Sequence, residues 1–489
     1  MFSLPVDPYT QTYMRLSWCR FMGLDEVLSK ALEALKPNAD ERVKIENLLN
    51  RLMDELKRGI RELGLNLNVE VEGSIAKDTW LSREQDIDVF LLFPKSYDKN
   101  EFRNVLLNLA RRVVGDNFIE AYAEHPYVEL NYEGVKIDLV PCLKLNSVDE
   151  AKTAVDRTPF HTAYVKANLS EKAKDEVRLL KGFMKGIGCY GAEMKVKGFS
   201  GYLCELLVLY YGSFIDVLKN AMNWKPFSTV IDIEGYYSNP KEAIRIFDAP
   251  LIVIDPVDKN RNVAAALSID SMSKFISASK LFIESPNLKF FFPELIEPLS
   301  KDNIISEFNA RGSDLIFVIT SCPKVHSEIL WGQLYKTLDG LRKLLLNFDF
   351  NVINYDVWSD EKSAVVFVFE LEHSKLPNIK RHVGPPVYIF DEADKFLRKY
   401  LNSPNVFSGP KIEGFRWIVY LKRRYADAKQ LLYEKMKSAK MGNLMKSLLT
   451  TNQTILKNEE ILDFYSNNRE FAIFLTKYLK GAYPWLTKV

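Results

Sequence analysis

A short apolar run that begins with acidic residues most constrains what this chain can fold into. Residues 87–93 are apolar apart from Asp88, Asp86 lies two residues before it, and Pro94 closes the run. Such a run is too short for a helix and is typical of a buried strand. Because residues two apart on a strand project to the same face, Asp86 and Asp88 are predicted to lie together. Two carboxylates near a core repel each other and lose hydration. A cation between them offsets this energetic cost.

A third acid, Asp138, interrupts another apolar run at residues 135–140. This run and residues 127–132 flank a Glu-Gly turn, which predicts a β-hairpin. Three carboxylates on neighbouring strands offer the hard oxygen ligands that suit Mg²⁺. Two such ions stabilise both the attacking and the leaving oxygen of an in-line displacement at phosphorus. We therefore predict a catalytic metal site formed by Asp86, Asp88 and Asp138.

The pair Gly73-Ser74 precedes these acids and predicts a phosphate contact. Glycine lets the backbone approach a phosphate, and the serine hydroxyl can donate to it. The chain has no GxxxxGK[ST] motif, which excludes a P-loop. Each signal is weak alone, because a Gly-Ser pair is usually a turn and an Asp-x-Asp occurs on many surface strands. Their order and spacing together resemble the nucleotidyltransferase superfamily that includes DNA polymerase β.

Length and patterning predict a multidomain α+β chain. The 489 residues, 47% of them hydrophobic, are more than one core needs. Helical periodicity is found at residues 24–63, 101–114, 172–185, 201–218, 263–282, 427–449 and 459–479. We predict a polymerase β-like nucleotidyltransferase domain with a mixed sheet at 1–155 and a helical domain at 156–285. Residues 286–489 would form a body and helical tail, with a ferredoxin-like β-α-β-β unit starting near 313.

Basic residues are concentrated at the C-terminal end. Residues 411–489 hold 15 Lys and Arg but 7 Asp and Glu, whereas the whole chain has a net charge of +2. This favours a polyanion contact, with Lys422, Arg423 and Arg424 as candidates, although a solvated surface explains it equally well. The five cysteines form no CxxC pair, which favours a reducing cytoplasm. Neither a signal pattern nor a membrane span is predicted.

Nine segments, in order, resemble the archaeal (class I) CCA-adding enzymes. They are residues 73–80, 86–94, 123–128, 140–142, 154–161, 190–193, 198–207, 255–258 and 261–265. The similarity extends over residues 24–285, whereas the rest of the chain resembles the family only in layout. Two departures are visible. Asp86 stands where a family member has glutamate, and Lys77 replaces an arginine, which keeps the charge but loses the bidentate fork.

The resemblance implies template-independent addition of C, C and A to the 3′ end of tRNA from CTP and ATP. It implies that Ser74 and Lys77 hold the triphosphate. His161, Lys181 and Tyr190 would complete the nucleotide pocket. Arg261 would read the edge of the incoming base. The resemblance further implies contact with the acceptor stem and T arm of tRNA, a cytoplasmic location and a homodimer.

Simpler interpretations stay open for these residues: a cap for His161, a solvated helix face for Lys181, a packing aromatic for Tyr190 and an ion pair for Arg261. For the whole chain, one alternative is a poly(A) or oligoadenylate polymerase of the same superfamily. The other is a non-catalytic RNA-binding protein that retains a degenerate transferase fold. The sequence does not show which C-terminal residues contact tRNA, how the pocket changes from C to A, or what residues 1–22 do.

Overall fold

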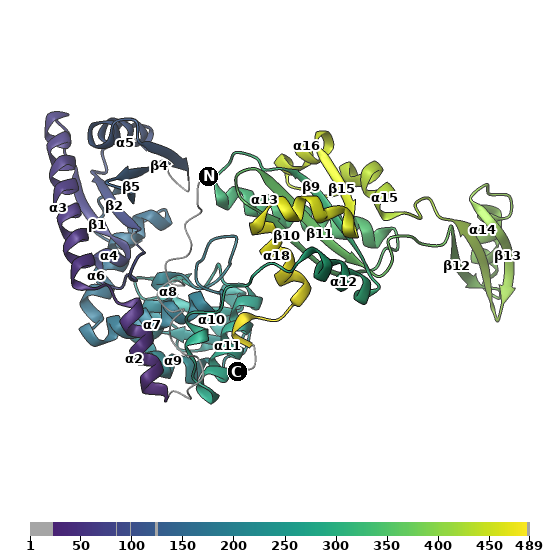
Figure 1. The fold of residues 1–489 in the computed structure, drawn as a ribbon, viewed down its shortest axis with the longest axis horizontal. Helices are drawn as coiled ribbons and strands as arrows, with labels where there is room; N and C mark the ends of the chain where they lie inside the picture. Colours follow the sequence, from purple (N-terminus) through teal and green to yellow (C-terminus); the bar gives the residue numbers. More distant parts are fainter. Residues whose placement is uncertain (1–22, 85, 98, 123–125, 487–489) are drawn as a thin grey trace. The chain divides into compact units, whose positions relative to one another are not determined.

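The computed structural model describes residues 23–84, 86–97, 99–122 and 126–486. Residues 1–22, and 123–125 within one family-like segment, lie outside the described part. The chain divides into two compact units, Met1–Leu295 with Tyr483–Val489, and Ile296–Ala482 (Figure 1). The domain boundaries expected at 155 and 285 stay predictions.

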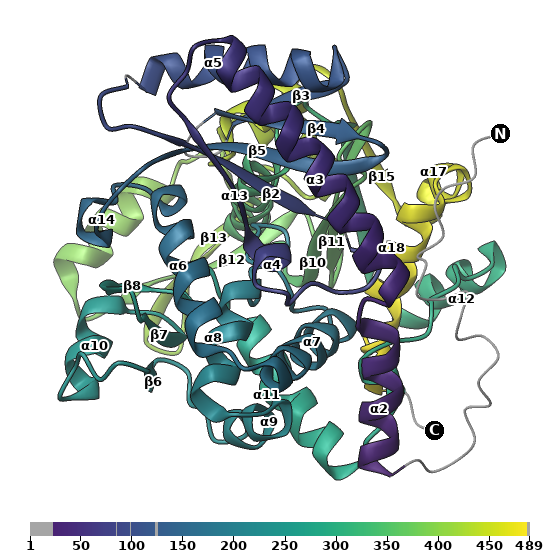
Figure 2. The same ribbon diagram turned by 90° about the vertical axis from the view of Figure 1, so that its left-hand side faces the viewer.

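Two helices open the described chain, α2 (Leu24–Leu35) and α3 (Ala39–Glu62). They confirm the predicted helical span, with a break between them. Asn38 starts α3 through a capping box, in which its side chain accepts from the Glu41 N–H and the Glu41 carboxylate accepts from the Asn38 N–H. The apolar stripe of α3 packs against the sheet that follows (Figure 2).

A five-stranded sheet has the order β1-β2-β5-β4-β3. Its strands are β1 (Asn68–Glu72), β2 (Ile87–Phe93), β3 (Phe118–Tyr122), β4 (Pro126–Tyr132) and β5 (Val135–Leu143). β2 and β5 run parallel, and the other neighbours are antiparallel. The predicted strand at 87–93 and the β4–β5 hairpin are confirmed, and β3 is an addition. Helices α3 and α5 (Lys99–Val114) cover one face and bury alternate residues of β2 and β5.

The opposite face is covered by α6 (Ala154–Asn168), which no periodicity predicted. Pro159 lies inside this helix, where a proline is normally excluded. It has no N–H for the Val155 carbonyl, and the Cys142 thiol of β5 donates to that carbonyl instead, at 3.7 Å. The contact therefore ties α6 to the sheet at the position where the helix lacks a hydrogen bond.

The rest of the first unit is mostly helical and packs around Phe183, whose ring contacts five other phenylalanine rings. Its elements are α4 (Gly73–Ala76), α7 (Glu171–Gly186), α8 (Gly201–Tyr211), α9 (Phe214–Ala221), β6 (Thr229–Asp232), α10 (Pro240–Phe247), β7 (Leu251–Asp255), β8 (Asp258–Asn262) and α11 (Ile269–Glu284). The helix predicted from residue 263 begins only with α11. The Asn262 side chain accepts hydrogen bonds from the N–H groups of Val253 and Ala264. Residues 263–266 therefore form a turn before the helix begins.

The helix predicted at 201–218 is wrong as a single element. Gly212 adopts φ +94 and ends α8, and the Ser213 side chain then caps α9. Within the described residues, no single helix is long and apolar enough to cross a membrane. α8 and α9 reach that length and apolar character only when they are counted as one span, and a bend of 91° separates them.

The second unit contains a complete ferredoxin-like sheet. β9 (Asp314–Ser321), α13 (Ser327–Asn347), β10 (Val352–Ser359) and β11 (Ala364–Leu371) confirm the predicted β-α-β-β order. β15 (Gln453–Lys457) completes it in the antiparallel order β10-β11-β9-β15. The remaining helices are α12 (Lys301–Arg311), α15 (Ala428–Lys435), α16 (Asn443–Thr451), α17 (Leu462–Asn467) and α18 (Arg469–Lys480). The two long C-terminal helices that were predicted are therefore each divided.

A further sheet is inserted between β11 and α15. It has the order β12-β14-β13 and consists of β12 (Ile379–Pro386), β13 (Val406–Glu413) and β14 (Arg416–Lys422), with α14 (Phe390–Tyr400) between the first two. The Gly-Pro-Pro segment at the end of β12 hid this strand from pattern analysis. β12 is an edge strand, where proline is tolerated because no second neighbour needs its N–H.

Candidate active site

Two of the predicted acids lie side by side on adjacent parallel strands. Asp88 of β2 pairs in register with Asp138 of β5, so both side chains project from the same face. Glu72 of β1 is opposite Asp88, and Glu129 of β4 is opposite Asp138, which gives a row of four acids across the sheet. Asp86 directly precedes β2 and is exposed.

Burial and neighbouring carboxylates raise the pKa of both strand acids. Burial, followed by the charges of Asp138 and Asp86, raises the pKa of Asp88 to about 6. Burial also raises the pKa of Asp138 to about 6, with Lys136 opposing and Glu129 adding to the shift. Oδ1 of Asp138 is buried with no hydrogen-bond partner among the described residues, and Lys136 Nζ lies 3.8 Å from it. The acid row therefore has an electrostatic cost that a bound cation would relieve.

Gly73 brings the start of α4 directly against this row. Its φ is +69, and a Cβ at this position would lie 2.1 Å from Oδ2 of Asp88. Only glycine fits both the backbone conformation and the carboxylate. The predicted phosphate contact, Ser74, follows immediately and is thereby held close to Asp88.

The acids fit a divalent cation by their chemistry and placement, without forming a complete cage. Among the residues that the structure describes, no three His, Cys, Asp or Glu side chains are close enough to hold a metal ion by themselves. The carboxylates of Asp86, Asp88 and Asp138 are nevertheless the ligands that Mg²⁺ prefers. The buried Oδ1 of Asp138, which accepts no hydrogen bond from the described residues, is the observation that supports the fit.

A pocket of about 300 Å³ lies in the first unit, between residues 79–86 and α7. Four predicted site residues line it, namely Ser74, Asp86, Lys181 and Tyr190. The pocket thus combines one acid of the predicted metal site with predicted phosphate and nucleotide contacts. Concave sites with a few convergent polar groups are where small ligands bind.

Lys77, the predicted triphosphate contact, and Lys181, predicted to complete the nucleotide pocket, share one buried carboxylate, Glu205 of α8. Lys77 Nζ donates to Oε2 of Glu205 at 2.5 Å, and Lys181 Nζ lies 3.4 Å from Oε1. Lys181 also donates to the carbonyl and the hydroxyl of Thr79, at 3.0 Å each. Burial raises the pKa of Glu205, but the two ammonium groups lower it by more than burial raises it. The pKa therefore lies below its ordinary value, and the carboxylate stays ionised. Lys181 is therefore not on a solvated helix face, and Lys77 points at Glu205 and is not a pocket-lining residue.

His161 and Arg261 meet on the buried carboxylate of Asp255, which is not part of the pocket lining. His161 Nε2 donates to Oδ2 at 2.8 Å, and Arg261 Nη1 donates to the same oxygen at 2.7 Å. Tyr202 donates to Oδ1 at 3.1 Å and stacks on the His161 ring. Burial lowers the pKa of His161. The ion pair considered for Arg261 is thus present, and its role in reading a base stays a prediction.

Comparison with known proteins identifies the family. Three family models match: a nucleotidyltransferase domain over residues 53–161, a tRNA nucleotidyltransferase second domain over 175–292, and a CCA-adding enzyme C-terminal domain over 311–458. The chain is 38% identical to the CCA-adding enzyme of Methanosarcina barkeri, over 94% of this chain and 99% of that relative. It is 41% identical to the CCA-adding enzyme of Saccharolobus shibatae, over 76% of this chain and 84% of the relative. The chain belongs to the CCA-adding enzyme family.

The expected multidomain α+β architecture with a nucleotidyltransferase domain is therefore confirmed for this family member. Among solved structures, the Cid1 poly(U) polymerase aligns at 16% identity with a TM-score of 0.42, over 55% of this chain and 99% of that chain. Enzymes of the nucleotidyltransferase superfamily generally use divalent metal ions.

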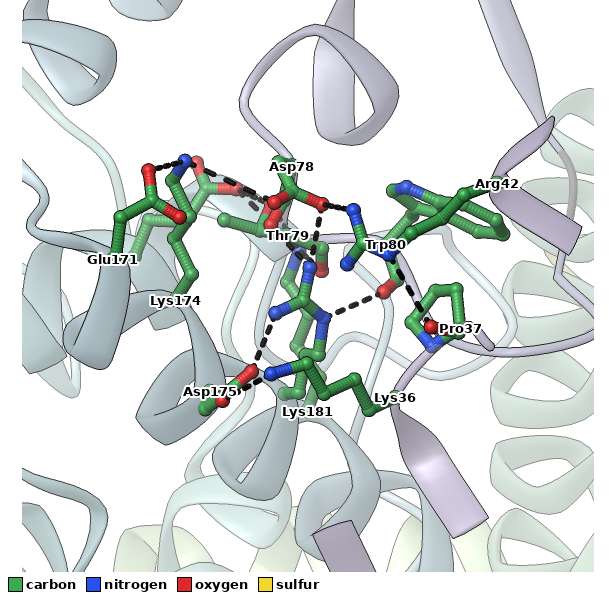
Figure 3. Close-up of polar contacts among 12 residues, drawn as sticks. Lys36, Pro37, Arg42, Asp78, Thr79, Trp80, Glu171, Lys174, Asp175 and Lys181 are labelled. Carbon is green, nitrogen blue, oxygen red and sulfur yellow. Dashed lines mark hydrogen bonds and ion pairs between the residues drawn. The ribbon is translucent and has the colours of Figure 1, made fainter. Parts of the chain in front are cut away.

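A buried arginine that the sequence patterns did not predict fixes the pocket wall of this CCA-adding family member. Arg178 of α7 donates to the backbone carbonyls of Asp78 and Trp80, at 2.5 and 3.1 Å, and to the carboxylates of Asp78 and Asp175. Asp78 has φ +53 and also pairs with Arg42 of α3 at 2.9 Å. Figure 3 shows cationic side chains converging on Asp78, with Thr79 and Trp80 beside it. The wall is therefore fixed from both α3 and α7.

The signal for this cluster was present in the sequence. Arg178, Lys181 and Lys185 recur at spacings of three and four residues, so they share one face of α7. Arg178 and Lys181 are almost completely buried. Cations at helical spacing inside an apolar helix indicate partners in the fold or a bound anion, not a solvated face.

The basic cluster Lys422, Arg423 and Arg424 lies at the end of β14. Arg423 donates to Asp349 at 2.5 Å, Lys422 donates to a backbone carbonyl at 3.0 Å, and the Arg424 guanidinium lies over the ring of Tyr425. Part of this charge therefore already has partners within the fold. Its contact with RNA phosphate stays a prediction.

Proposed function

We propose that this chain adds C, C and A to the 3′ end of tRNA, using CTP and ATP without a template and releasing pyrophosphate. The carrying observation is the register of Asp88 and Asp138 beside a pocket lined by Asp86, Ser74 and Lys181. Membership of the CCA-adding enzyme family supports the substrates. In the reaction, the tRNA 3′-oxygen forms a bond to the α-phosphorus of the nucleotide while the bond to the pyrophosphate oxygen breaks.

Asp86, Asp88 and Asp138 would hold Mg²⁺, which supplies charge stabilisation at the attacking and leaving oxygens when it is bound. Ser74 contributes a hydroxyl at the start of α4, beside Asp88. Lys181 contributes positive charge to the pocket wall, and Tyr190 an aromatic surface. Lys77 stabilises Glu205 and adds positive potential near Asp88, whose pKa it lowers.

His161 and Arg261 would act at the base end of the nucleotide. Arg261 is half-buried and keeps one side of its guanidinium on Asp255, which leaves further N–H groups for the edge of C or A. Its planar fork is suited to an acceptor edge. His161 fixes Asp255 from the other side, so it would hold Arg261 in position through that carboxylate.

We further propose a catalytic head at 1–155, a nucleotide-recognition neck at 156–285 and a tRNA-binding body and tail at 286–489. The body and tail would contact the acceptor stem and T arm through backbone phosphates, because duplex RNA displays little sequence in its accessible groove. The protein would act in the cytoplasm as a homodimer.

An incorporation assay tests the function. The protein is incubated with tRNA that lacks its 3′ CCA, with CTP alone, with ATP alone or with both, and with or without Mg²⁺. We expect two C residues from CTP alone, and a terminal A only when both nucleotides are present. A run of A residues on unrelated RNA would instead indicate the poly(A) polymerase alternative.

The acids are tested in the same assay. Asp88→Ala should abolish incorporation and leave tRNA affinity nearly unchanged, because the side chain acts on the reacting phosphate and not on the RNA body. Equal loss of binding and incorporation would show that Asp88 serves the fold.

A further inference from the structure

Two charged side chains that have no role in the reaction above meet at the nucleotide pocket. Glu84 comes from the segment before β2 and Lys185 from the last turn of α7, and both line the pocket. Their carboxylate and ammonium groups form a direct ion pair. The Lys185 ammonium also lies over the ring of Tyr190, 5.3 Å from its centroid. The pair therefore joins two walls of the same pocket.

The two pocket lysines differ in what their ammonium groups already contact. An ammonium has three donors, and Lys181 has three neighbouring acceptors inside the fold, two on Thr79 and one on Glu205. Its side chain is 2% exposed, whereas that of Lys185 is 35% exposed. Lys185 lies one helical turn beyond Lys181, on the same face of α7. An incoming anion can therefore reach Lys185 without breaking the buried network.

We propose that Lys185 binds a phosphate of the incoming nucleoside triphosphate, and that Glu84 holds its ammonium until the nucleotide displaces it. The inference rests on the proposed function of this pocket. A triphosphate carries several charges and offers more acceptor oxygens than a single carboxylate, so it replaces Glu84 favourably. A nucleoside without phosphates has nothing to offer Lys185 and leaves the ion pair intact. Lys185 thus favours triphosphates over unphosphorylated nucleosides, and Glu84 reduces that gain because its carboxylate competes with the phosphate.

The test is nucleotide binding by calorimetry, with the full-length protein, ATP and Mg²⁺, and no tRNA. Lys185→Gln should weaken ATP binding about tenfold, which corresponds to ~1.4 kcal/mol. Glu84→Gln should tighten ATP binding a few-fold, because the competing carboxylate is gone. Adenosine should bind both variants as it binds the wild-type protein. The matched control is Lys280→Gln on α11, which removes a lysine from an exposed pair with Glu284 and should change nothing.

The distinguishing result is that the two variants change ATP affinity in opposite directions, weaker in Lys185→Gln and tighter in Glu84→Gln. An ion pair that only supports the fold would give weaker ATP binding in both variants, and that outcome overturns the proposal. Unchanged ATP affinity in Lys185→Gln overturns it as well. If the wild-type protein extends tRNA while Lys185→Gln binds ATP normally, only this inference fails. If the wild-type protein incorporates neither C nor A, the proposed function fails and the inference with it.

Discussion

Gly73 lies so close to the Asp88 carboxylate that no larger residue fits at position 73 unless that carboxylate moves. Gly73→Ala would place a Cβ 2.1 Å from the Asp88 carboxylate, so the carboxylate must move. We expect incorporation to fall by about a hundredfold or more, because a displacement of ~1 Å at a reacting centre costs that much. The rate of single-nucleotide incorporation measures this.

Gly134, in the β4–β5 turn of the same sheet, is the matched control. It has φ +80, yet nothing lies within 4 Å of a Cβ added there. Gly134→Ala carries the same backbone strain without the contact with Asp88, so it should lose stability but keep its activity. If both variants lose activity equally, strain in the sheet and not the Asp88 contact is responsible.

The raised pKa of Asp138 predicts that its carboxylate lowers the stability of the fold, although the proposed metal site needs it. Because burial raises this pKa to about 6, ionisation disfavours the folded state, and the cost grows as pH rises from about 4 through 6. Asp138→Asn removes the cost, so without divalent cations it should raise the free energy of unfolding at pH 7.5 by at most roughly 3 kcal/mol. The gain should shrink as pH falls through 6 toward the ordinary pKa of 3.8, and it should vanish only below that value, where the carboxyl is protonated in both states. A gain that is the same at pH 4.5 and 7.5 would contradict the assignment.

The acid row was predictable from the sequence only in part. Asp88 and Asp138 interrupt apolar strands, and period-two patterning places such residues on one face. Their alignment depends on the parallel register of β2 and β5, which are not adjacent in sequence. Glu129 joins the row across the predicted β4–β5 hairpin, whereas Glu72 joins it through the pairing of β1 with β2, which local pattern did not indicate.

At the scale of elements, α7 connects the pocket wall to the core. Arg178→Met should destabilise the first unit by about 3–5 kcal/mol, because it leaves the buried Asp78 and Trp80 carbonyls without their donor. Asp175 keeps its ion pair with Lys36 but loses the one with Arg178. It should also raise the KM for nucleotides, since residues 79–81 line the pocket. Thermal unfolding and steady-state kinetics measure the two effects.

The control for this prediction is Arg51→Met on α3. Arg51 pairs with Glu133 at 2.6 Å at the surface, so it loses an exposed salt bridge of similar geometry. Exposed pairs contribute little to stability. We therefore expect little change in either readout, and a loss as large as that of Arg178→Met would show that burial is not the cause.

Elements with strong periodicity were predicted, and those that depend on distant partners were not. α3, β2, β9 and β11 have clear apolar patterns and lie where the sequence placed them. α6 contains Pro159, and the Val155 carbonyl that this proline cannot serve lies 3.7 Å from the Cys142 thiol of β5. β15 is five residues long and is defined by pairing with β9 from far earlier in the chain. Local sequence does not encode such long-range support.

At the scale of the whole molecule, the chain returns to the unit in which it began. Tyr483–Val489 belong to the first unit, and the short 3₁₀ helix η5 (Pro484–Leu486) places Trp485 in its core. The Trp485 ring lies 5.8 Å from the ring of Phe290, which itself stacks on Phe183. Residues 296–482 are thus an insertion, in sequence terms, into the unit that contains the pocket lined by Asp86 and Lys181.

Trp485 should therefore stabilise a pocket from which it is distant in sequence. Trp485→Ala removes a side chain that is 3% exposed, which typically costs about 3–5 kcal/mol. We expect a lower unfolding midpoint, and ATP with Mg²⁺ should restore part of the loss because it binds only the folded first unit. Trp485→Phe keeps an aromatic ring against Phe290 and should lose less. If Trp485→Ala unfolds at the wild-type temperature, the C-terminal segment does not contribute to the first core, and its return to that unit has no energetic role.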